Sequence, residues 1–171
     1  MSPHEHSDGI GNEHPRSHQI QLFCFVLFLL IWIIDSFLLN LTTQLSKVIP
    51  IPFRLFVFII LALIAYRLVD GSHKLVLTGN SNDEPKVVTG DVYAYLRHPM
   101  YFAYIITFFA LIQLTMSIIS LIPLVITFFL LNVIASYEEK ELVKILGQEY
   151  INYMNRVHRW VPNLLNLFNR D

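Results

Sequence analysis

The longest uncharged stretch of the sequence most constrains how the chain can fold. Residues 100–137 contain no Lys, Arg, Asp or Glu. About 20 helical residues span the hydrocarbon core of a bilayer, so this stretch is too long for a single crossing. It must turn, and Ser117, Ser120 and Pro123 near its middle are residues that favour a turn. The sequence therefore predicts a tight hairpin of two membrane helices.

Two further apolar runs precede this hairpin. Residues 20–41 are aliphatic and aromatic, with Asp35 as their only charge, and residues 53–69 form a second, short run. An acid inside a membrane segment suggests a function, but Asp35 lies near the end of its run beside Ser36 and Asn40, which favours an interfacial position. We therefore predict an all-α fold, a polytopic membrane bundle of about four transmembrane helices.

Composition supports this class of protein and excludes others. Hydrophobic residues make up 54% of the chain and are blocked into runs rather than spread periodically. The formal net charge is −1, and no basic cluster predicts nucleic-acid binding. The single cysteine, Cys24, cannot form an intramolecular disulfide. The bilayer is therefore the predicted partner of the chain.

The chain divides into three predicted parts. Residues 1–19 are a polar, histidine-containing tail that we expect to be disordered. Their histidine spacings match no metal site, and we predict no metal site elsewhere. Residues 20–69 form the two N-terminal membrane helices, and residues 70–171 form a core of connector, hairpin and C-terminal segment. The connector covers residues 70–97, and within it residues 86–95 carry enough apolar and aromatic side chains to fold over a ligand.

The C-terminal segment predicts an amphipathic helix. Apolar side chains recur there at helical spacing, and Gly147 is expected to break or cap the helix: Leu142, Leu146, Tyr150, Met154 and Val157. The basic residues indicate an orientation. With both termini in the cytoplasm, only Lys47 and Arg54 of the 12 basic residues fall outside, which satisfies the positive-inside rule. The connector, the start of the hairpin and the C-terminal segment then share the cytoplasmic face.

The hairpin begins with a polar motif. Residues 97–101 have the sequence Arg-His-Pro-Met-Tyr. Proline is tolerated at the first helical position, so Pro99 predicts a helix start with His98 as its N-cap. Backbone N–H groups of the first turn lack intrahelical acceptors and can bind a carboxylate or phosphate. We expect these groups at Met100, Tyr101 and Phe102. The alternative is a simple helix start with interfacial tyrosines.

An ordered set of motifs resembles the isoprenylcysteine carboxyl methyltransferases and the phospholipid N-methyltransferases. The resemblance covers roughly residues 85–162, half of the chain, and the motifs lie at residues 88–93, 97–101, 138–142, 146–150, Tyr153 and 159–162. Members of that superfamily are integral membrane enzymes that use S-adenosylmethionine, bound at the cytoplasmic side. The resemblance therefore implies a membrane methyltransferase that acts on a lipid-like or prenylated substrate.

Carried over by position, the resemblance implies a set of cofactor contacts. We expect the carboxylate of S-adenosylmethionine at the first turn of the hairpin, its ammonium group at Glu138, and its sulfonium near aromatic rings. Glu139 is the nearest candidate base for an acceptor that must lose a proton. The implied cofactor contacts are Pro85, Lys86, Val87, Val88, Tyr93, His98, Pro99, Met100, Tyr101 and Glu138.

One departure concerns the substrate. Prenylcysteine enzymes carry an arginine one helical turn before the cofactor glutamate, where it meets the substrate carboxylate, and this chain has Ile134 there. Arg156 or Arg159 is then the candidate replacement. A phospholipid amine N-methyltransferase is one alternative. A sterol-type reductase is another, since it shares the acidic pair, but the connector offers only Lys74 and Lys86 for NADPH. A non-enzymatic membrane scaffold is the third.

Overall fold

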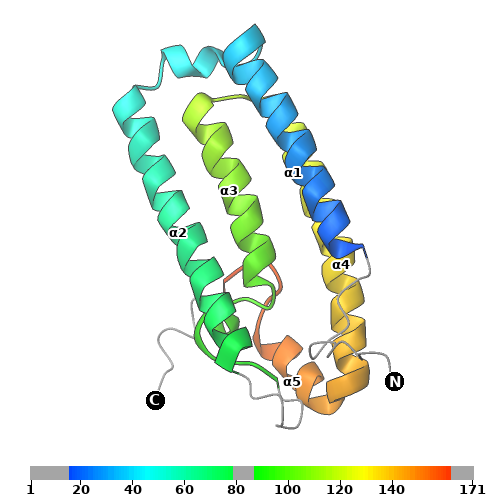
Figure 1. The fold of residues 1–171 in the computed structure, drawn as a ribbon. Coiled ribbons are helices and arrows are strands. Elements are labelled where there is room, and N and C mark those ends of the chain that lie inside the picture. The colour runs from blue at the N-terminus through cyan, green and yellow to red at the C-terminus, as the bar shows by residue number, and fades with distance from the viewer. Residues whose placement is uncertain (1–15, 79–86, 163–171) are drawn as a thin grey trace, which may run out of the picture.

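The described part of the chain is a bundle of helices. The computed structural model describes residues 16–78 and 87–162, and within them every regular element is helical, which confirms the predicted fold class. Four long helices run alternately in opposite directions, and a short fifth helix lies across one end (Figure 1). Their bounds are α1 Ser17–Ile33, α2 Ile51–Thr78, α3 Pro99–Thr115, α4 Leu121–Leu146 and α5 Gln148–Arg156.

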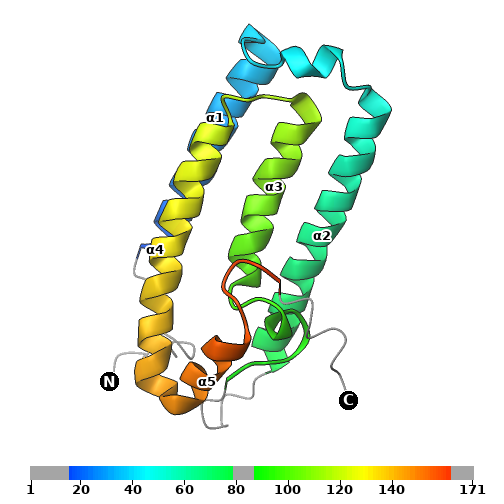
Figure 2. The same cartoon turned by 180° about the vertical axis from the view of Figure 1, so that it is seen from behind.

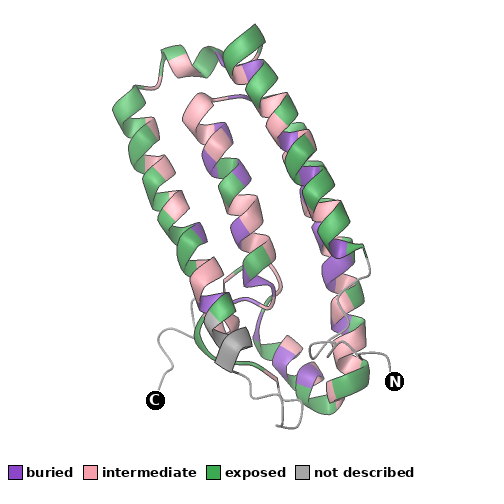
Figure 3. Ribbon diagram, in the orientation of Figure 1, coloured by how far each residue is buried: buried purple, intermediate pink, exposed green. Residues whose placement is uncertain are grey.

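Three of these helices are long and apolar enough to cross a membrane. They cover Ser17–Leu39, Ile51–His73 and Leu121–Leu146. Helix α3 is apolar but has 17 residues. At about 1.5 Å per residue it is shorter than the roughly 30 Å hydrocarbon core. Exposed residues follow the outer sides of the helices (Figure 3), and many are large and apolar, such as Leu22, Phe56 and Phe129. Such a surface suits contact with lipid.

The helices pack as two pairs, α2 with α3 and α1 with α4. Figure 2 shows α3 beside α2, and α4 in front of α1. The pairs are joined by a core cluster in which Phe28 of α1 meets Phe108 and Ile112 of α3. The Phe28 and Phe108 rings are stacked, with centroids 3.8 Å apart. Burial of such rings stabilises the bundle where lipid does not reach.

The predicted hairpin is present between α3 and α4. Helix α3 ends at Thr115, the left-handed φ of 60° at its C-cap Met116 turns the chain, and α4 begins at Leu121. The hydroxyl groups of Ser117 and Ser120 lie 2.7 Å apart in the turn and are fully buried. Pro123 lies in the first turn of α4, where the missing N–H costs no hydrogen bond.

The helix boundaries differ from the sequence prediction, most of all at the end of α2. Helix α1 begins at Ser17 rather than residue 20, and α2 continues to Thr78 instead of ending at residue 69. The end of an apolar run marks where hydrocarbon contact stops, whereas backbone hydrogen bonding continues through polar residues. The first part of the predicted connector is therefore helical. Predictions for residues 1–15, 79–86 and 163–171 lie outside the described residues.

Asp35 ties the end of α1 to the hairpin turn. It lies in a π-helical turn, Ile34–Leu39, that continues α1, and it is 3% exposed. Its carboxylate accepts hydrogen bonds from the Thr42 N–H at 3.0 Å, the Thr42 hydroxyl at 2.6 Å and the Ser117 hydroxyl at 2.6 Å. The Thr42 hydroxyl in turn accepts from the Ile119 N–H at 3.0 Å. The acid is thus fully hydrogen-bonded, which makes its burial tolerable.

Replacing Asp35 with asparagine is expected to lower the melting temperature of the detergent-solubilised protein. An asparagine NH₂ group cannot accept the hydrogen bonds that one carboxylate oxygen now accepts, so donors would be left unpaired. The expected cost in free energy of unfolding is about 1–3 kcal/mol. Ser36→Ala is the matched control, because the Ser36 hydroxyl makes a 2.9 Å bond to Thr115 at the same end of the bundle but does not touch the carboxylate. Equal melting temperatures for the two variants would show that Asp35 does not hold this end together.

Candidate active site

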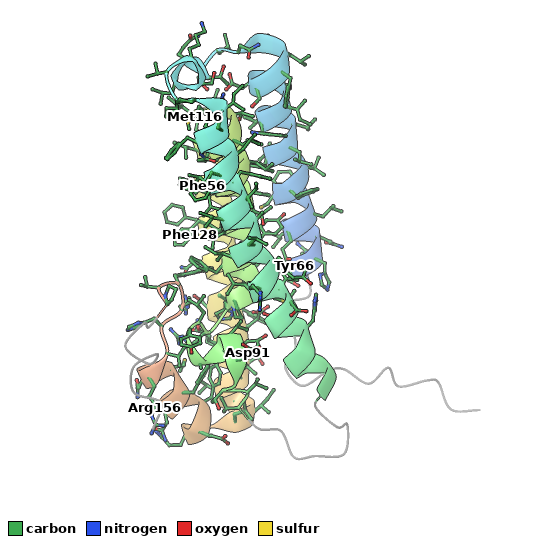
Figure 4. All side chains as sticks on the ribbon, turned by 90° about the vertical axis from the view of Figure 1, so that its left-hand side faces the viewer. Phe56, Tyr66, Asp91, Met116, Phe128 and Arg156 are labelled. Carbon is green, nitrogen blue, oxygen red and sulfur yellow. The ribbon has the colours of Figure 1, made fainter. Side chains whose placement is uncertain are left out.

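Most of the sequence-predicted site residues meet at one end of the bundle. There α2 ends, α3 begins, α4 ends and α5 crosses (Figure 1). The connector reaches this end through a short 3₁₀ helix, Asp91–Ala94, and Figure 4 shows Asp91 beside the lower part of α2. Gly71 of α2 permits this contact, because a Cβ there would lie 2.7 Å from the Val92 side chain. The connector therefore packs directly on α2.

Helix α3 starts as predicted, with His98 as its N-cap and Pro99 as its first residue. The Phe102 N–H donates to the His98 carbonyl at 3.1 Å, so the prediction of an unpaired donor at Phe102 is wrong. Phe102 is the first residue that can reach a carbonyl four positions back, and the N-cap supplies that carbonyl. The role of the Met100 and Tyr101 N–H groups stays a prediction.

Glu139 lies at the centre of a cluster of hydrogen bonds and ion pairs. It is 6% exposed. Its Oε1 accepts from His98 Nε2 at 3.1 Å and Arg159 Nε at 3.0 Å, and it lies 3.3 Å from Arg97 Nη1. Its Oε2 accepts from Arg159 Nη2. Two arginines and a histidine thus surround one buried carboxylate, a geometry that stabilises its negative charge.

Glu138 lies on the other side of His98. Its Oε1 accepts a hydrogen bond from the Tyr101 hydroxyl at 2.5 Å, and its Oε2 is 3.6 Å from His98 Nδ1. The His98 and Tyr101 rings stack with centroids 5.5 Å apart and an interplanar angle of 3°. His98 is therefore held between two carboxylates, with Nε2 toward Glu139 and Nδ1 toward Glu138. This arrangement brings together four residues that the sequence singled out.

Residues 157–162, which we call the C-terminal hook, return from α5 to the side of α4. Arg159 Nη1 donates to Asn132 Oδ1 at 2.9 Å and to the Ser136 hydroxyl at 2.8 Å. Trp160 Nε1 donates to the same Asn132 oxygen at 3.0 Å. The Arg97 N–H, just before α3, donates to the His158 carbonyl at 3.1 Å. The hook thus joins α4 to the start of α3.

Helix α5 packs against Val157, the first residue of the hook. Gly147, with a positive φ of 57°, ends α4, and α5 starts at the next residue. Tyr150 and Tyr153 form a buried cluster with Val157, against which the other predicted apolar positions pack: Leu142, Leu146 and Met154. Burial raises the pKa of both tyrosines, so the phenols stay protonated. Tyr153 accordingly donates to the Tyr93 carbonyl at 2.8 Å.

Tyr93 connects the predicted cofactor segment to α2. Burial raises the pKa of its phenol, partly offset by a hydrogen bond with Ser72, so this hydroxyl also remains protonated. Val87, another predicted contact, packs against the α5 cluster, and its N–H lies 3.4 Å from Glu149 Oε1. Val88 is exposed beside it. The predicted contacts at Pro85 and Lys86 lie outside the described residues.

The candidate substrate residues are separated by the fold. Ile134 is 1% exposed within α4. Arg156 is exposed on α5 (Figure 4). Arg159 is bound to Glu139, Asn132 and Ser136. Sequence reasoning missed Asn132 and Ser136, and it placed Trp160 in the motif at residues 159–162 without assigning it a contact. The available signal was that Asn132, Ser136 and Glu139 follow one another at helical spacing, which places them on one face of α4.

A groove of about 370 Å³ lies between α2 and α3, within the part of α2 that is apolar enough to cross a membrane. Its volume falls within the roughly 300–1,000 Å³ that small-molecule sites occupy. Tyr66, visible on α2 in Figure 4, lies at this groove. The lining is mainly apolar: Phe58, Ala62, Ala65, Tyr66, Val69, Thr107, Ala110 and Leu111.

Comparison with known proteins matches the part of the chain that carries this site. The family model of the phospholipid methyltransferases matches residues 51–149, more than half of the chain. Methanethiol S-methyltransferase 1 of Bradyrhizobium diazoefficiens is 30% identical over 94 residues, which cover 54% of this chain and 32% of that protein. Methanethiol S-methyltransferase of Pseudomonas deceptionensis is 34% identical over 73 residues, which cover 43% of this chain and 27% of that protein. The chain thus spans about a third of the length of these relatives.

Proposed function

The chain belongs to the phospholipid methyltransferase family, and from this premise we propose that it is an integral membrane methyltransferase that uses S-adenosylmethionine. The observation that carries the proposal is the placement of His98 between Glu138 and Glu139 beside the N-terminus of α3. One carboxylate is held by arginines. The second, Glu138, is bonded to a tyrosine hydroxyl and has a side chain that is 15% exposed.

The acidic side chain of Glu138 and the N–H groups at the start of α3 fit the polar end of S-adenosylmethionine. We assign Glu138 to the ammonium group of the cofactor and the N-terminus of α3, at Met100 and Tyr101, to its carboxylate. The stacked rings of His98 and Tyr101 lie beside this position, where an aromatic face can stabilise a sulfonium by about 1 kcal/mol. When bound, the cofactor supplies an electrophilic methyl group. The protein contributes orientation of the two reactants and exclusion of water.

We propose an apolar acceptor that carries no free negative charge. An anionic acceptor needs a cation, and both nearby arginines are already paired with Glu139. Ile134, in the position where an arginine would meet a carboxylate, is buried and apolar. Burying an unpaired carboxylate is very costly. The groove between α2 and α3 offers such a lipid-like acceptor a path from the bilayer.

A small thiol is the second candidate acceptor, because the two relatives are named methanethiol S-methyltransferases. A neutral thiol satisfies the same charge argument. The thiolate is the nucleophile, so the thiol enters neutral and gives its proton to water before transfer. The new carbon–sulfur bond then forms as the bond from the methyl group to the sulfonium breaks, and S-adenosylhomocysteine leaves. We assign Glu139 a positioning role in this reaction, because both of its oxygens are occupied by arginine and histidine donors.

Binding of S-adenosylhomocysteine tests the reaction class. Calorimetric titration of the detergent-solubilised protein is expected to show binding of S-adenosylhomocysteine and none of NADPH. Binding of NADPH alone would favour a sterol-type reductase. Binding of neither would favour a scaffold and overturn the proposal.

The acceptor prediction compares three substrates with labelled S-adenosylmethionine. We expect methyl transfer to an alkanethiol and little transfer to a farnesylated cysteine analogue or to phosphatidylethanolamine. Ile134→Arg is expected to leave S-adenosylhomocysteine binding unchanged and either to create activity toward the prenylcysteine or to leave it unchanged. Brisk turnover of the prenylcysteine by the parent protein would overturn the charge argument.

We also propose that the site faces the cytoplasm. In a Cys24→Ser background, a cysteine at Asn155 on α5 is expected to resist a membrane-impermeant thiol reagent in intact cells. A cysteine at Lys47, in the loop at the opposite end, is expected to react. Both positions are exposed, so reactivity reports sidedness. The reverse labelling pattern would place the site outside.

A further inference from the structure

One amide side chain on α4 holds the C-terminal hook. The Asn132 oxygen accepts from Arg159 Nη1 at 2.9 Å and from Trp160 Nε1 at 3.0 Å. Both partners can only donate, so the amide must turn its oxygen toward the hook. Ser136, one turn further along α4, accepts a second bond from Arg159 Nη1. Asn132 is therefore the shared acceptor of two consecutive hook residues.

The hook lies along a single face of α4. Phe128, Asn132, Ser136 and Glu139 follow at spacings of three or four residues, which places them in one row. Trp160 packs on Phe128 with ring centroids 5.1 Å apart, while Arg159 reaches Glu139. The indole and the guanidinium thus extend from the hook toward opposite ends of the row, and Asn132 fixes both.

Arg159 in turn sets the orientation of Glu139. Its Nε and Nη2 contact the two oxygens of the carboxylate, a forked pairing that fixes the carboxylate plane. The fixed Oε1 then accepts from His98 Nε2. With that nitrogen held, the other, Nδ1, faces Glu138. The contacts form a continuous path from Asn132 to the acid assigned to the cofactor.

We propose that Asn132 is a positioning residue that, by holding Arg159 and Trp160 of the hook, aligns Glu139 and His98 for cofactor binding at Glu138. The proposal rests on the proposed function of this site. Asn132 itself contacts neither carboxylate in the described hydrogen bonds, so its effect on the cofactor is indirect. A purely structural role would change stability without changing affinity or turnover of the folded protein.

The test uses four variants of the full chain. Asn132→Leu removes the shared acceptor, and Asn132→Asp retains it. Ser136→Ala removes the second Arg159 acceptor and gives a milder change should Asn132→Leu fail to fold. Thr127→Val is the matched control, because the buried Thr127 hydroxyl on the same helix donates to the Pro123 carbonyl and not to the hook. A Trp32→Phe background leaves Trp160 as the only tryptophan.

Asn132→Leu is expected to raise the Kd for S-adenosylhomocysteine roughly tenfold, as for loss of a hydrogen bond to a charged group. It should also lower kcat and shift the Trp160 emission. Asn132→Asp should restore all three values, Ser136→Ala should show a smaller loss of affinity, and Thr127→Val should match the parent.

The failure of this proposal can be distinguished from the failure of the proposed function. The positioning role would be overturned if Asn132→Leu shifted the Trp160 emission but left Kd and kcat unchanged. If Asn132→Leu does not fold, unchanged affinity in Ser136→Ala would overturn it. Both results would leave the methyltransferase assignment intact. Loss of affinity that Asn132→Asp does not restore would also overturn it. Absence of S-adenosylhomocysteine binding by the parent protein would instead overturn the proposed function.

Discussion

Glu139→Gln is expected to cause the largest loss of stability among the substitutions at this site. The substitution removes the buried negative charge that Arg97, Arg159 and His98 share, and leaves two partly buried arginines without their counter-ion. Removing one partner of a buried ion pair destabilises by about 3–5 kcal/mol. The expected result is a clear drop in the melting temperature of the detergent-solubilised protein, measured in the absence of cofactor.

Glu141→Gln is the matched control for this experiment. Glu141 lies two residues further along α4 and pairs with Lys144 at 2.6 Å, but the lysine is 69% exposed. Exposed pairs contribute about 0.2–1 kcal/mol, so the control should melt close to the parent protein. If Glu139→Gln melted no earlier than Glu141→Gln, the arginine cluster would not be a stabilising centre.

The helical architecture could be predicted because apolar run length and helix-start chemistry are local properties. The uncharged run with Ser117 and Ser120 at its middle predicted the hairpin, and Pro99 predicted the first residue of α3. The end of α2 could not be predicted from hydropathy. A helix continues past the membrane wherever its backbone hydrogen bonds remain favourable. Gly71 does not mark the end of α2, because it lies inside the helix and its missing side chain lets Val92 pack closely against it.

The site was only partly accessible to sequence reasoning. Its acidic pair and His98 were identified from motifs, but the partners of each acid depend on which face of α4 it occupies. Adjacent residues on a helix point about 100° apart, so Glu138 and Glu139 have different neighbours. Contacts between Arg159 and Asn132 join residues 27 positions apart in the chain. Such contacts are fixed by the return of the hook, which local patterns do not encode.

Glu138→Gln is expected to weaken binding of S-adenosylhomocysteine more than any other single substitution while leaving the melting temperature nearly unchanged. Under the proposed function, Glu138 pairs with the cofactor ammonium in a partly desolvated position. Truncating one partner of such a pair costs about 2–4 kcal/mol, which corresponds to a loss of affinity of roughly 30-fold to 1,000-fold. Calorimetric titration of the parent, Glu138→Gln and Glu141→Gln measures this difference.

Tyr101→Phe makes the same experiment more specific. The Tyr101 hydroxyl donates to Glu138 Oε1, and the phenylalanine retains the ring that stacks on His98 while losing that bond. Because the carboxylate keeps its charge and only one hydrogen bond is lost, the binding free energy should weaken by about 0.5–1.5 kcal/mol, less than in Glu138→Gln. Unchanged affinity in Glu138→Gln, with a large loss in folded Glu139→Gln, would reverse the assignment of the acidic pair. Comparable losses in both acid variants, with folding intact, would mean that the two carboxylates contact the cofactor together rather than one supporting the other.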